Sequence, residues 1–256
     1  MTATATRRRK QLSDDQLLAL LETTRKADSV ELKLTVPASE QRATFIALGL
    51  DPLEAQVRLI HFFDTPDLDL QAAGVVARAR RIQGKGEDSV VKLRPVVPDE
   101  LPGSLRKSPN FVVEVDAMPG GYVCSGSMKG VPRKTTVPEA VAGTAPLRGL
   151  FSKEQRRFYA EHAPEDLALD DLTLLGPIFV LKLKGTPQGA GRKFAVELWL
   201  YPDGRILELS TRCRPSEAVA VAAESRAFLL ERGVDLLGDQ QTKTRTALEY
   251  FAAHPD

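Results

Sequence analysis

Short segments in which apolar and polar residues alternate recur along the chain. In residues 27–36, ADSVELKLTV, Val30 and Leu32 alternate with Glu31 and Lys33. Because successive side chains of a β-strand point to opposite faces, this pattern predicts a strand with one apolar and one polar face. The same pattern predicts further strands at residues 57–63, 74–82, 88–95, 110–117, 151–159, 177–184, 193–201 and 205–212.

Four other segments have the spacing of amphipathic helices instead. The first begins with Ser13-Asp14-Asp15-Gln16, which has the form of a capping box. The second ends at Gly49, and the third begins with Ser216 as its N-cap and ends before Gly233. The four predicted helices cover residues 13–26, 39–49, 216–232 and 242–253.

Proline and glycine mark the connections between these elements. They gather in residues 98–109 and 118–149, which we interpret as linkers, the second being a flexible lid or insertion. The sequence YPDG at 201–204 predicts a hairpin turn between the last two strands. Many strands with few helical crossovers favour an α+β fold, mainly antiparallel, in which a sheet or closed barrel has flanking helices. We expect a disordered basic tail at 1–12 and a single domain at 13–256.

Composition indicates which classes of partner and which compartment to expect for the protein. Of its 256 residues, 35 are Lys or Arg and 34 are Asp or Glu, so the net charge of +1 favours neither DNA nor a membrane as partner. The only cysteines, Cys124 and Cys213, form no CxxC motif, which does not indicate zinc and is typical of a reducing compartment. The sequence also has neither a signal-peptide pattern nor an apolar run of about 20 residues. We therefore expect a cytoplasmic monomer or homodimer.

Charged residues on the polar strand faces occur in pairs, mostly of one sign. Arg78 and Arg80 are two apart on one strand, and Glu114 and Asp116 are two apart on another. Each pair alone fits a solvent-exposed face, but such a face usually mixes signs to limit repulsion. If the helices cover the apolar outer face of a barrel, the charged faces point into its lumen. The other pairs are Glu31 with Lys33, Lys92 with Arg94, and Lys182 with Lys184.

A lumen that carries both signs suits a ligand that combines phosphate groups with metal ions. Arginine and lysine neutralise phosphate oxygens. Carboxylates hold Mg²⁺ or Mn²⁺, which bridges the same oxygens. The charge pattern therefore predicts a small molecule with a chain of phosphates, either a nucleotide or triphosphate, as the partner.

Several motifs resemble the CYTH family, also called triphosphate tunnel metalloenzymes. They are ELK at 31–33 and FDTPDLDLQAAGVVARAR at 63–80, followed in the expected order by VVKLR, VVEVD, KEQRRFY and ILELSTRCRPSEA. QTKTRTALEYF is similar to the closing segment of the family, and the resemblance covers about residues 28–250. It implies an eight-stranded antiparallel closed tunnel barrel that binds a triphosphate or a related organic phosphate. Members include triphosphatases and class IV adenylyl cyclases.

The resemblance also implies roles for individual residues. As phosphate-binding bases it assigns Lys33, Arg78, Arg80, Lys92, Arg156 and Lys243, with Arg157 as a substitute for Arg156. The charge pattern adds Arg94, Lys182 and Lys184. The matching acids are Glu31, Glu114, Asp116, Glu197 and Glu208. We expect Glu31, Glu114, Asp116 and Glu208 to hold Mg²⁺ or Mn²⁺, and Glu31, Lys33 and Glu197 to take part in catalysis.

Two serines depart from the family pattern. Ser29 stands where the opening strand of the family usually has an acid, and Ser210 stands where its last strand often has a second acid. Fewer carboxylates weaken divalent metal binding, so a one-metal enzyme or weak metal binding is expected. The leading hypothesis is a metal-dependent phosphohydrolase acting on triphosphate or on nucleoside tri- or diphosphates. The alternatives are a class IV-type adenylyl cyclase and a non-catalytic nucleotide- or polyphosphate-binding protein.

Overall fold

The protein is seen in a computed structural model that describes residues 14–254 except 237, 239 and 241. The predicted tail at 1–12 and the predicted helix start at Ser13 lie outside these residues. No helix within them is both long and apolar enough to span a bilayer.

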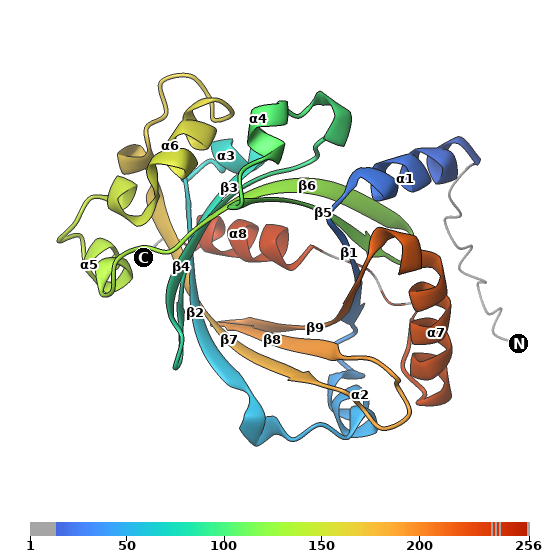
Figure 1. Ribbon diagram of the computed structural model, residues 1–256. Coiled ribbons are helices and arrows are strands. Elements are labelled where there is room, and N and C mark those ends of the chain that lie inside the picture. The colour runs from blue at the N-terminus through green and yellow to red at the C-terminus, as the bar shows by residue number, and fades with distance from the viewer. Residues whose placement is uncertain (1–13, 237, 239, 241, 255–256) are drawn as a thin grey trace, which may run out of the picture.

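A closed β-barrel forms the centre of the molecule (Figure 1). Within the described residues it has nine strands, in the order β1-β5-β6-β4-β3-β2-β7-β8-β9, with β9 pairing back onto β1. The strands are β1 Ser29–Val36, β2 Gln56–Asp64, β3 Val75–Ile82, β4 Gly86–Leu93, β5 Phe111–Met118, β6 Gly121–Gly130, β7 Thr173–Gly185, β8 Phe194–Tyr201 and β9 Gly204–Cys213. The closed barrel and its flanking helices confirm the predicted class, but the expected number of eight strands is wrong.

The barrel is not wholly antiparallel, because β1 and β5 pair in parallel. This pairing sets Ser29 opposite Glu114 and Glu31 opposite Asp116. Sequence alternation gives the face to which a side chain points but not the neighbouring strand, so the parallel pair was not predicted.

Helices cover much of the barrel exterior (Figure 1). Their apolar residues pack on the outward-facing residues of the strands, as when Phe228 and Leu229 join Leu34 and Leu207 in one buried cluster. The helices are α1 Asp14–Lys26, α2 Gln41–Leu48, α3 Asp69–Ala72, α4 Gly103–Arg106, α5 Thr136–Val141, α6 Lys153–Ala160, α7 Ala218–Glu231 and α8 Lys243–Ala253.

Most helix and turn predictions are confirmed. Gly49 ends α2 with a positive φ of 61°, a conformation that glycine adopts without strain. Tyr201 pairs with Gly204 across the predicted hairpin turn. Asp64, after the second strand, accepts backbone N–H bonds from Thr65, Leu70 and Gln71 and so orders the start of α3. Ser216 does not cap α7, because a short 3₁₀ turn at Pro215–Glu217 precedes that helix.

Two predicted segments are wrong. Residues 151–159 are not a strand: they contain most of α6, whose buried Gln155, Phe158 and Tyr159 have helical spacing. Ser152 and Gln155 form a capping box at its start. The predicted linker at 118–149 contains β6 and α5. Small residues such as Ser125 and Ser127 give β6 little alternation of apolar and polar residues, so the sequence did not indicate a strand there.

α8 occupies a place that the sequence did not indicate. Its Ala247 and Leu248 are buried with Phe62 and Trp199, whose side chains face the barrel interior. Tyr250 donates a hydrogen bond to Asp203 in the β8–β9 turn at 2.8 Å. Seen in Figure 1, α8 therefore lies across one end of the barrel instead of on its outer face. It forms an apolar floor, and charged side chains line much of the remaining interior.

Candidate functional site

The barrel interior contains a cavity of about 490 Å³. Its walls are the inward-facing side chains of the strands together with the first turn of α8. Among the described residues that line it, ten are Lys or Arg and six are Asp or Glu, an excess of four positive charges. Since the whole chain has a net charge of only +1, basic charge is concentrated here. The predicted residues that line it are Glu31, Lys33, Arg78, Arg80, Lys92, Arg94, Glu114, Asp116, Lys182, Glu197, Glu208 and Lys243.

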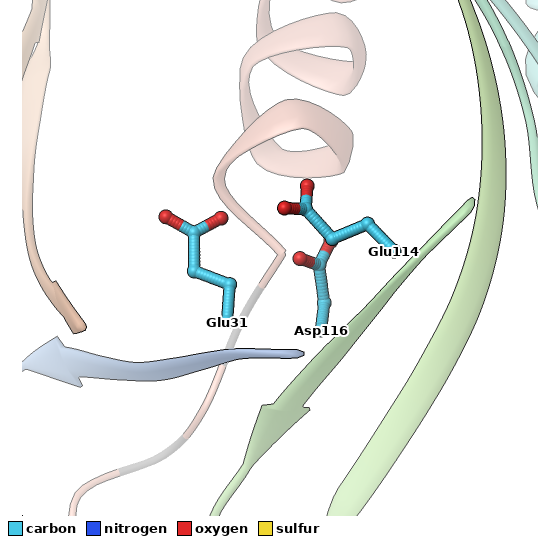
Figure 2. A group of neighbouring side chains, drawn as sticks. All are labelled: Glu31, Glu114 and Asp116. Carbon is cyan, nitrogen blue, oxygen red and sulfur yellow. The ribbon is translucent and has the colours of Figure 1, made fainter. Parts of the chain in front are cut away.

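Three carboxylates meet on one side of this cavity (Figure 2). Glu31, Glu114 and Asp116 each offer an oxygen atom, and these atoms lie within 4.8 Å of one another. The parallel pairing of β1 with β5 brings them together, because it aligns Glu31 with Asp116. Carboxylate oxygens are the ligands that Mg²⁺ and Mn²⁺ prefer, so the group fits a divalent cation.

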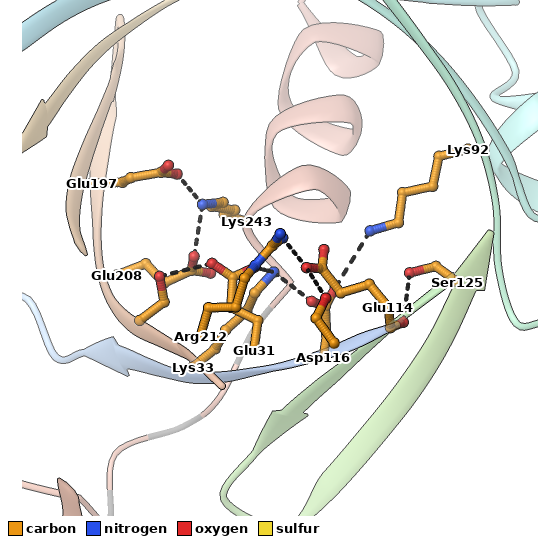
Figure 3. Close-up of polar contacts among 12 residues, drawn as sticks. Glu31, Lys33, Lys92, Glu114, Asp116, Ser125, Glu197, Glu208, Arg212 and Lys243 are labelled. Carbon is orange, nitrogen blue, oxygen red and sulfur yellow. Dashed lines mark hydrogen bonds and ion pairs between the residues drawn. The ribbon is translucent and has the colours of Figure 1, made fainter. Parts of the chain in front are cut away.

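Basic side chains contact the same carboxylates (Figure 3). Lys33 Nζ lies 2.9 Å from Asp116 and 3.3 Å from Glu31, while Lys92 Nζ lies 3.4 Å from Asp116. Arg212 pairs with Glu114. Burial alone raises the pKa of Asp116, but Lys92 and Lys33 outweigh burial and lower this pKa to about 2. The acid is therefore ionised and ready to act as a ligand at neutral pH.

The two serines also contact this acidic group. Ser29 Oγ donates to Glu114 at 3.2 Å, and Ser210 Oγ donates to Glu31 at 2.9 Å. Each hydroxyl occupies one acceptor position of an acid that could ligate a metal. The two serines therefore orient Glu31 and Glu114, but they add no negative charge.

A second network joins α8 to the barrel (Figure 3). Lys243 pairs with Glu197 and also lies 2.7 Å from Glu208. Glu197 further accepts from Lys182 and, at 3.2 Å, from Trp199 Nε1. Burial raises the pKa of Glu197, but Lys243 and Lys182 more than offset this and hold the pKa well below its ordinary value.

These contacts bear on two predicted roles. Lys182, Lys243 and Trp199 all donate to the carboxylate of Glu197, which makes it an anchor for Lys243. Its part in catalysis remains a prediction. Glu208 also contacts Lys243 and is not one of the three acids that meet at the possible metal site. That Glu208 ligates a metal remains a prediction.

Guanidinium groups form the wall of β3 and β4. Arg80 donates to both oxygens of Asp88, at 2.7 and 2.5 Å. In the part of the chain that the structure describes, Arg78 and Arg94 have no carboxylate within ion-pair distance. Burial first, and then the charge of Arg80, lower the pKa of Arg78 to about 9. Such a buried, uncompensated guanidinium favours an anionic ligand.

Three predicted phosphate-binding residues do not lie with the others. Arg156 and Arg157 are on α6, outside the barrel, where Arg156 donates to the Phe151 carbonyl and Arg157 pairs with Glu161. Both belong to the segment 151–159 that was predicted as a strand, and most of this segment is helical. Lys184 is solvent-exposed near the end of β7 and does not line the cavity. Lys182, two residues earlier, lies inside.

The sequence analysis missed several charged residues of the cavity wall. Arg58 has the same strand parity as Ile60 and Phe62, and Arg212 has the parity of Glu208 and therefore points inward. Parity alone could have identified these two arginines, but they match no motif. Asp88 and Lys129 also line the cavity.

Comparison with known proteins agrees with this architecture. Neither a protein-family model nor a curated protein matches the chain. Among solved structures, the chain is similar to HpAC1 from Hippeastrum, described as a candidate adenylyl cyclase with a dominant triphosphatase activity. The TM-score is 0.64 at 17% identity, covering 86% of this chain and 95% of that one.

A candidate adenylate cyclase from Bacillus halodurans is also similar. The TM-score is 0.59 at 10% identity, covering 86% of this chain and 97% of that one. At these identities the likeness concerns the fold, which agrees with the fold that the sequence motifs imply. The chain therefore has the fold of the CYTH, or triphosphate tunnel, family.

Proposed function

We propose that the protein is a metal-dependent phosphohydrolase that cleaves phosphoanhydride bonds of triphosphate or of nucleoside tri- or diphosphates. One observation carries the proposal: three converging carboxylates share a cavity with guanidinium groups that lack carboxylate partners among the described residues. Such a cavity provides for both components of a metal–phosphate complex. The triphosphatase activity described for HpAC1 supports the same conclusion.

The basic wall would bind the phosphate chain. Arg78 and Arg94 offer planar donors that match phosphate oxygens, and Lys92 adds a point charge. Hydrolysis adds water to a phosphorus atom and breaks its bond to the bridging oxygen. Negative charge develops on this leaving oxygen, and the preorganised cations would stabilise it. Positioning and electrostatics thus supply most of the rate, without a covalent intermediate.

The acidic wall would hold the cation, which we propose is Mg²⁺ or Mn²⁺. Glu31, Glu114 and Asp116 would be its ligands. When bound, a divalent cation polarises phosphate oxygens and lowers the pKa of coordinated water. Lys33 contacts both Glu31 and Asp116, so its part would be to orient these two carboxylates.

Phosphate release tests the proposal. The purified protein is incubated with triphosphate, ATP, GTP, ADP or thiamine triphosphate, with Mg²⁺ or Mn²⁺. Arg78→Ala and Glu114→Ala should each reduce kcat/KM by roughly 10²–10³, the usual effect of removing one transition-state stabiliser. Arg81→Ala is the matched control, because Arg81 lies on the same strand as Arg78 but is solvent-exposed. An Arg81→Ala variant as impaired as Arg78→Ala would contradict the assignment.

A class IV-type adenylyl cyclase is the second candidate, since both similar structures are described as candidate cyclases. The same cations would bind ATP, and the ribose 3′-oxygen would replace water as the nucleophile. Cyclic AMP with pyrophosphate, measured in the same reactions, would support this candidate over the hydrolase. Binding without turnover would indicate a non-catalytic protein, and a folded protein that neither binds nor cleaves these compounds would rule out all three.

A further inference from the structure

The guanidinium groups of the cavity form a row along β3 and its neighbouring strands. The Arg94 N–H donates to the Gly74 carbonyl at 2.8 Å, which places Arg94 beside the start of β3. Arg78 and Arg80 follow along β3 itself. Arg58, on β2, pairs with Ile82 at the far end of β3. All four arginines line the cavity.

This row is longer than a triphosphate requires. Gly74 and Ile82 are eight residues apart, and a strand rises about 3.3 Å per residue, so the row extends over roughly 26 Å of backbone. The three converging carboxylates, Glu31, Glu114 and Asp116, lie nearer the Arg94 end of the row. Asp116 contacts Lys92, and Lys92 pairs with Val76 near the start of β3. A triphosphate held beside that group would leave the Arg58 end unused.

Arg58 lies in surroundings that favour an anion. Its only hydrogen bond in the described structure goes to Gln56 Oε1 at 2.9 Å, and its buried Nε has no partner. Burial first, and then Arg80, lower the pKa of Arg58, and together they outweigh the opposite effect of Glu197 and Asp88. Lys182 lies close to Arg58. The pKa of this lysine is lowered by burial, then by the charge of Lys243 and then by the charge of Arg58. Two carboxylates lie near Arg58, but Asp88 gives both its oxygens to Arg80, and Glu197 pairs with Lys182 and Lys243. Within the described residues, neither forms an ion pair with Arg58.

A nucleoside fits this outer position poorly. The aromatic side chains that line the cavity in the described structure are Phe62 and Trp199, and each is only 1% exposed. Both are packed against α8 and cannot stack on a base without rearrangement. Beside Arg58, Gln56 and Lys182 pair across β2 and β7 and offer an amide and an ammonium group, whose N–H donors suit phosphate oxygens.

We propose that Arg58, with Lys182 beside it, forms an outer phosphate subsite, so that the cavity prefers linear inorganic polyphosphate of more than three phosphates. The inference rests on the proposed function, since it assumes that the inner phosphates lie beside the acidic group. Arg58 is then the residue that sets the preferred chain length.

Calorimetric titration tests the inference with triphosphate, a linear polyphosphate of about ten phosphates and ATP as separate ligands. The wild-type protein should bind the longer chain at least tenfold more tightly than triphosphate or ATP. Arg58→Gln should weaken binding of the longer chain by about tenfold, the scale of one charge-assisted contact, and change triphosphate binding less than twofold. Arg81→Gln, on the exposed face of β3, is the control and should change none of these affinities.

The outcomes separate this inference from the proposed function. Three results would overturn the outer subsite and leave the proposed phosphohydrolase intact. The wild-type protein could bind triphosphate and the longer chain with equal affinity. Arg58→Gln could weaken the binding of both by the same factor, or it could weaken the binding of ATP as much as that of the longer chain. If the wild-type protein binds none of the three ligands, the proposed function itself fails. Thermal unfolding of Arg58→Gln verifies that the variant is folded, and Arg58→Lys, which keeps the charge, should recover part of the longer-chain affinity.

Discussion

At the residue scale, Ser29 and Ser210 separate this chain from the pattern that its motifs resemble. Ser29 donates a hydrogen bond to Glu114 and Ser210 donates one to Glu31, two of the three carboxylates that could hold a metal ion. A serine at these positions can donate a hydrogen bond to the neighbouring carboxylate, but unlike an acid it adds no negative charge. The candidate metal site therefore has three carboxylates and lacks the further acids of the family pattern, so its affinity for a divalent cation should be lower.

Restoring one acid should strengthen that site. Ser29→Glu adds a carboxylate beside Glu114 and should tighten Mn²⁺ binding by about tenfold, because each added charged ligand raises divalent affinity. Electron paramagnetic resonance of free Mn²⁺ in titrations without phosphate measures this directly. Ser29→Gln, of the same size but neutral, should show no gain. Unchanged affinity in Ser29→Glu would mean that residue 29 does not reach the cation.

At the element scale, the position of α8 depends on a buried ionic network. Glu197 on β8 binds Lys243 at the start of this helix, and it also binds Lys182 on β7. The side chains of Glu197 and Lys243 are 13% and 15% exposed, so solvent screens their interaction little. Removing the acid leaves two ammonium groups without their shared partner.

Loss of this carboxylate should destabilise the protein. Glu197→Gln should lower the free energy of unfolding by about 3 kcal/mol, the scale for breaking a buried pair. Lys243→Met should cost less, since Glu197 keeps Lys182. Urea unfolding measures both variants. Equal losses in the two would show that Glu197 does not serve as the shared anchor.

The same network predicts how stability depends on pH. The folded-state pKa of Glu197 lies well below the ordinary value of 4.5, so its contribution is fully present above pH 4.5. This contribution is lost as the pH falls below 4.5 toward the folded-state pKa, where the native carboxylate is protonated. Unfolding measured between pH 7 and 3 should show a smaller loss of stability in Glu197→Gln than in the wild type. Parallel profiles would contradict this assignment.

At the scale of the whole molecule, charge is distributed unevenly. The chain has a net charge of +1, yet the described residues lining its cavity carry an excess of four positive charges. The remainder of the molecule is therefore slightly acidic. Under the proposed function, attraction of a phosphate ligand would arise from the enclosed cavity and not from overall charge.

Binding should accordingly weaken as salt rises. Raising KCl from 50 to 500 mM should increase the Kd for triphosphate by roughly tenfold or more, because ions compete with several phosphate contacts. Calorimetry at the two concentrations provides the measurement. Arg78→Gln should show a shallower salt dependence, since it makes one contact fewer. A Kd independent of salt would argue against a binding site built from cations.

The alternation of Val30, Glu31, Leu32 and Lys33 was enough to predict a strand and the face on which its charges lie, because side-chain direction is a local property of the backbone. The same reasoning failed for residues 151–159, which were predicted as a strand although Gln155, Phe158 and Tyr159 have helical spacing. It also missed β6, whose small residues give little contrast between faces.

Local pattern could not say which strands are neighbours. The meeting of Glu31 with Asp116 depends on a parallel pair between segments some eighty residues apart, and the apolar floor of the cavity depends on α8 entering the end of the barrel. Both arise from long-range packing of elements whose apolar faces must be buried together. The kinds of charge in the cavity were thus readable from strand parity, whereas their convergence into an acidic group and a basic row followed from barrel closure, which local periodicity does not encode.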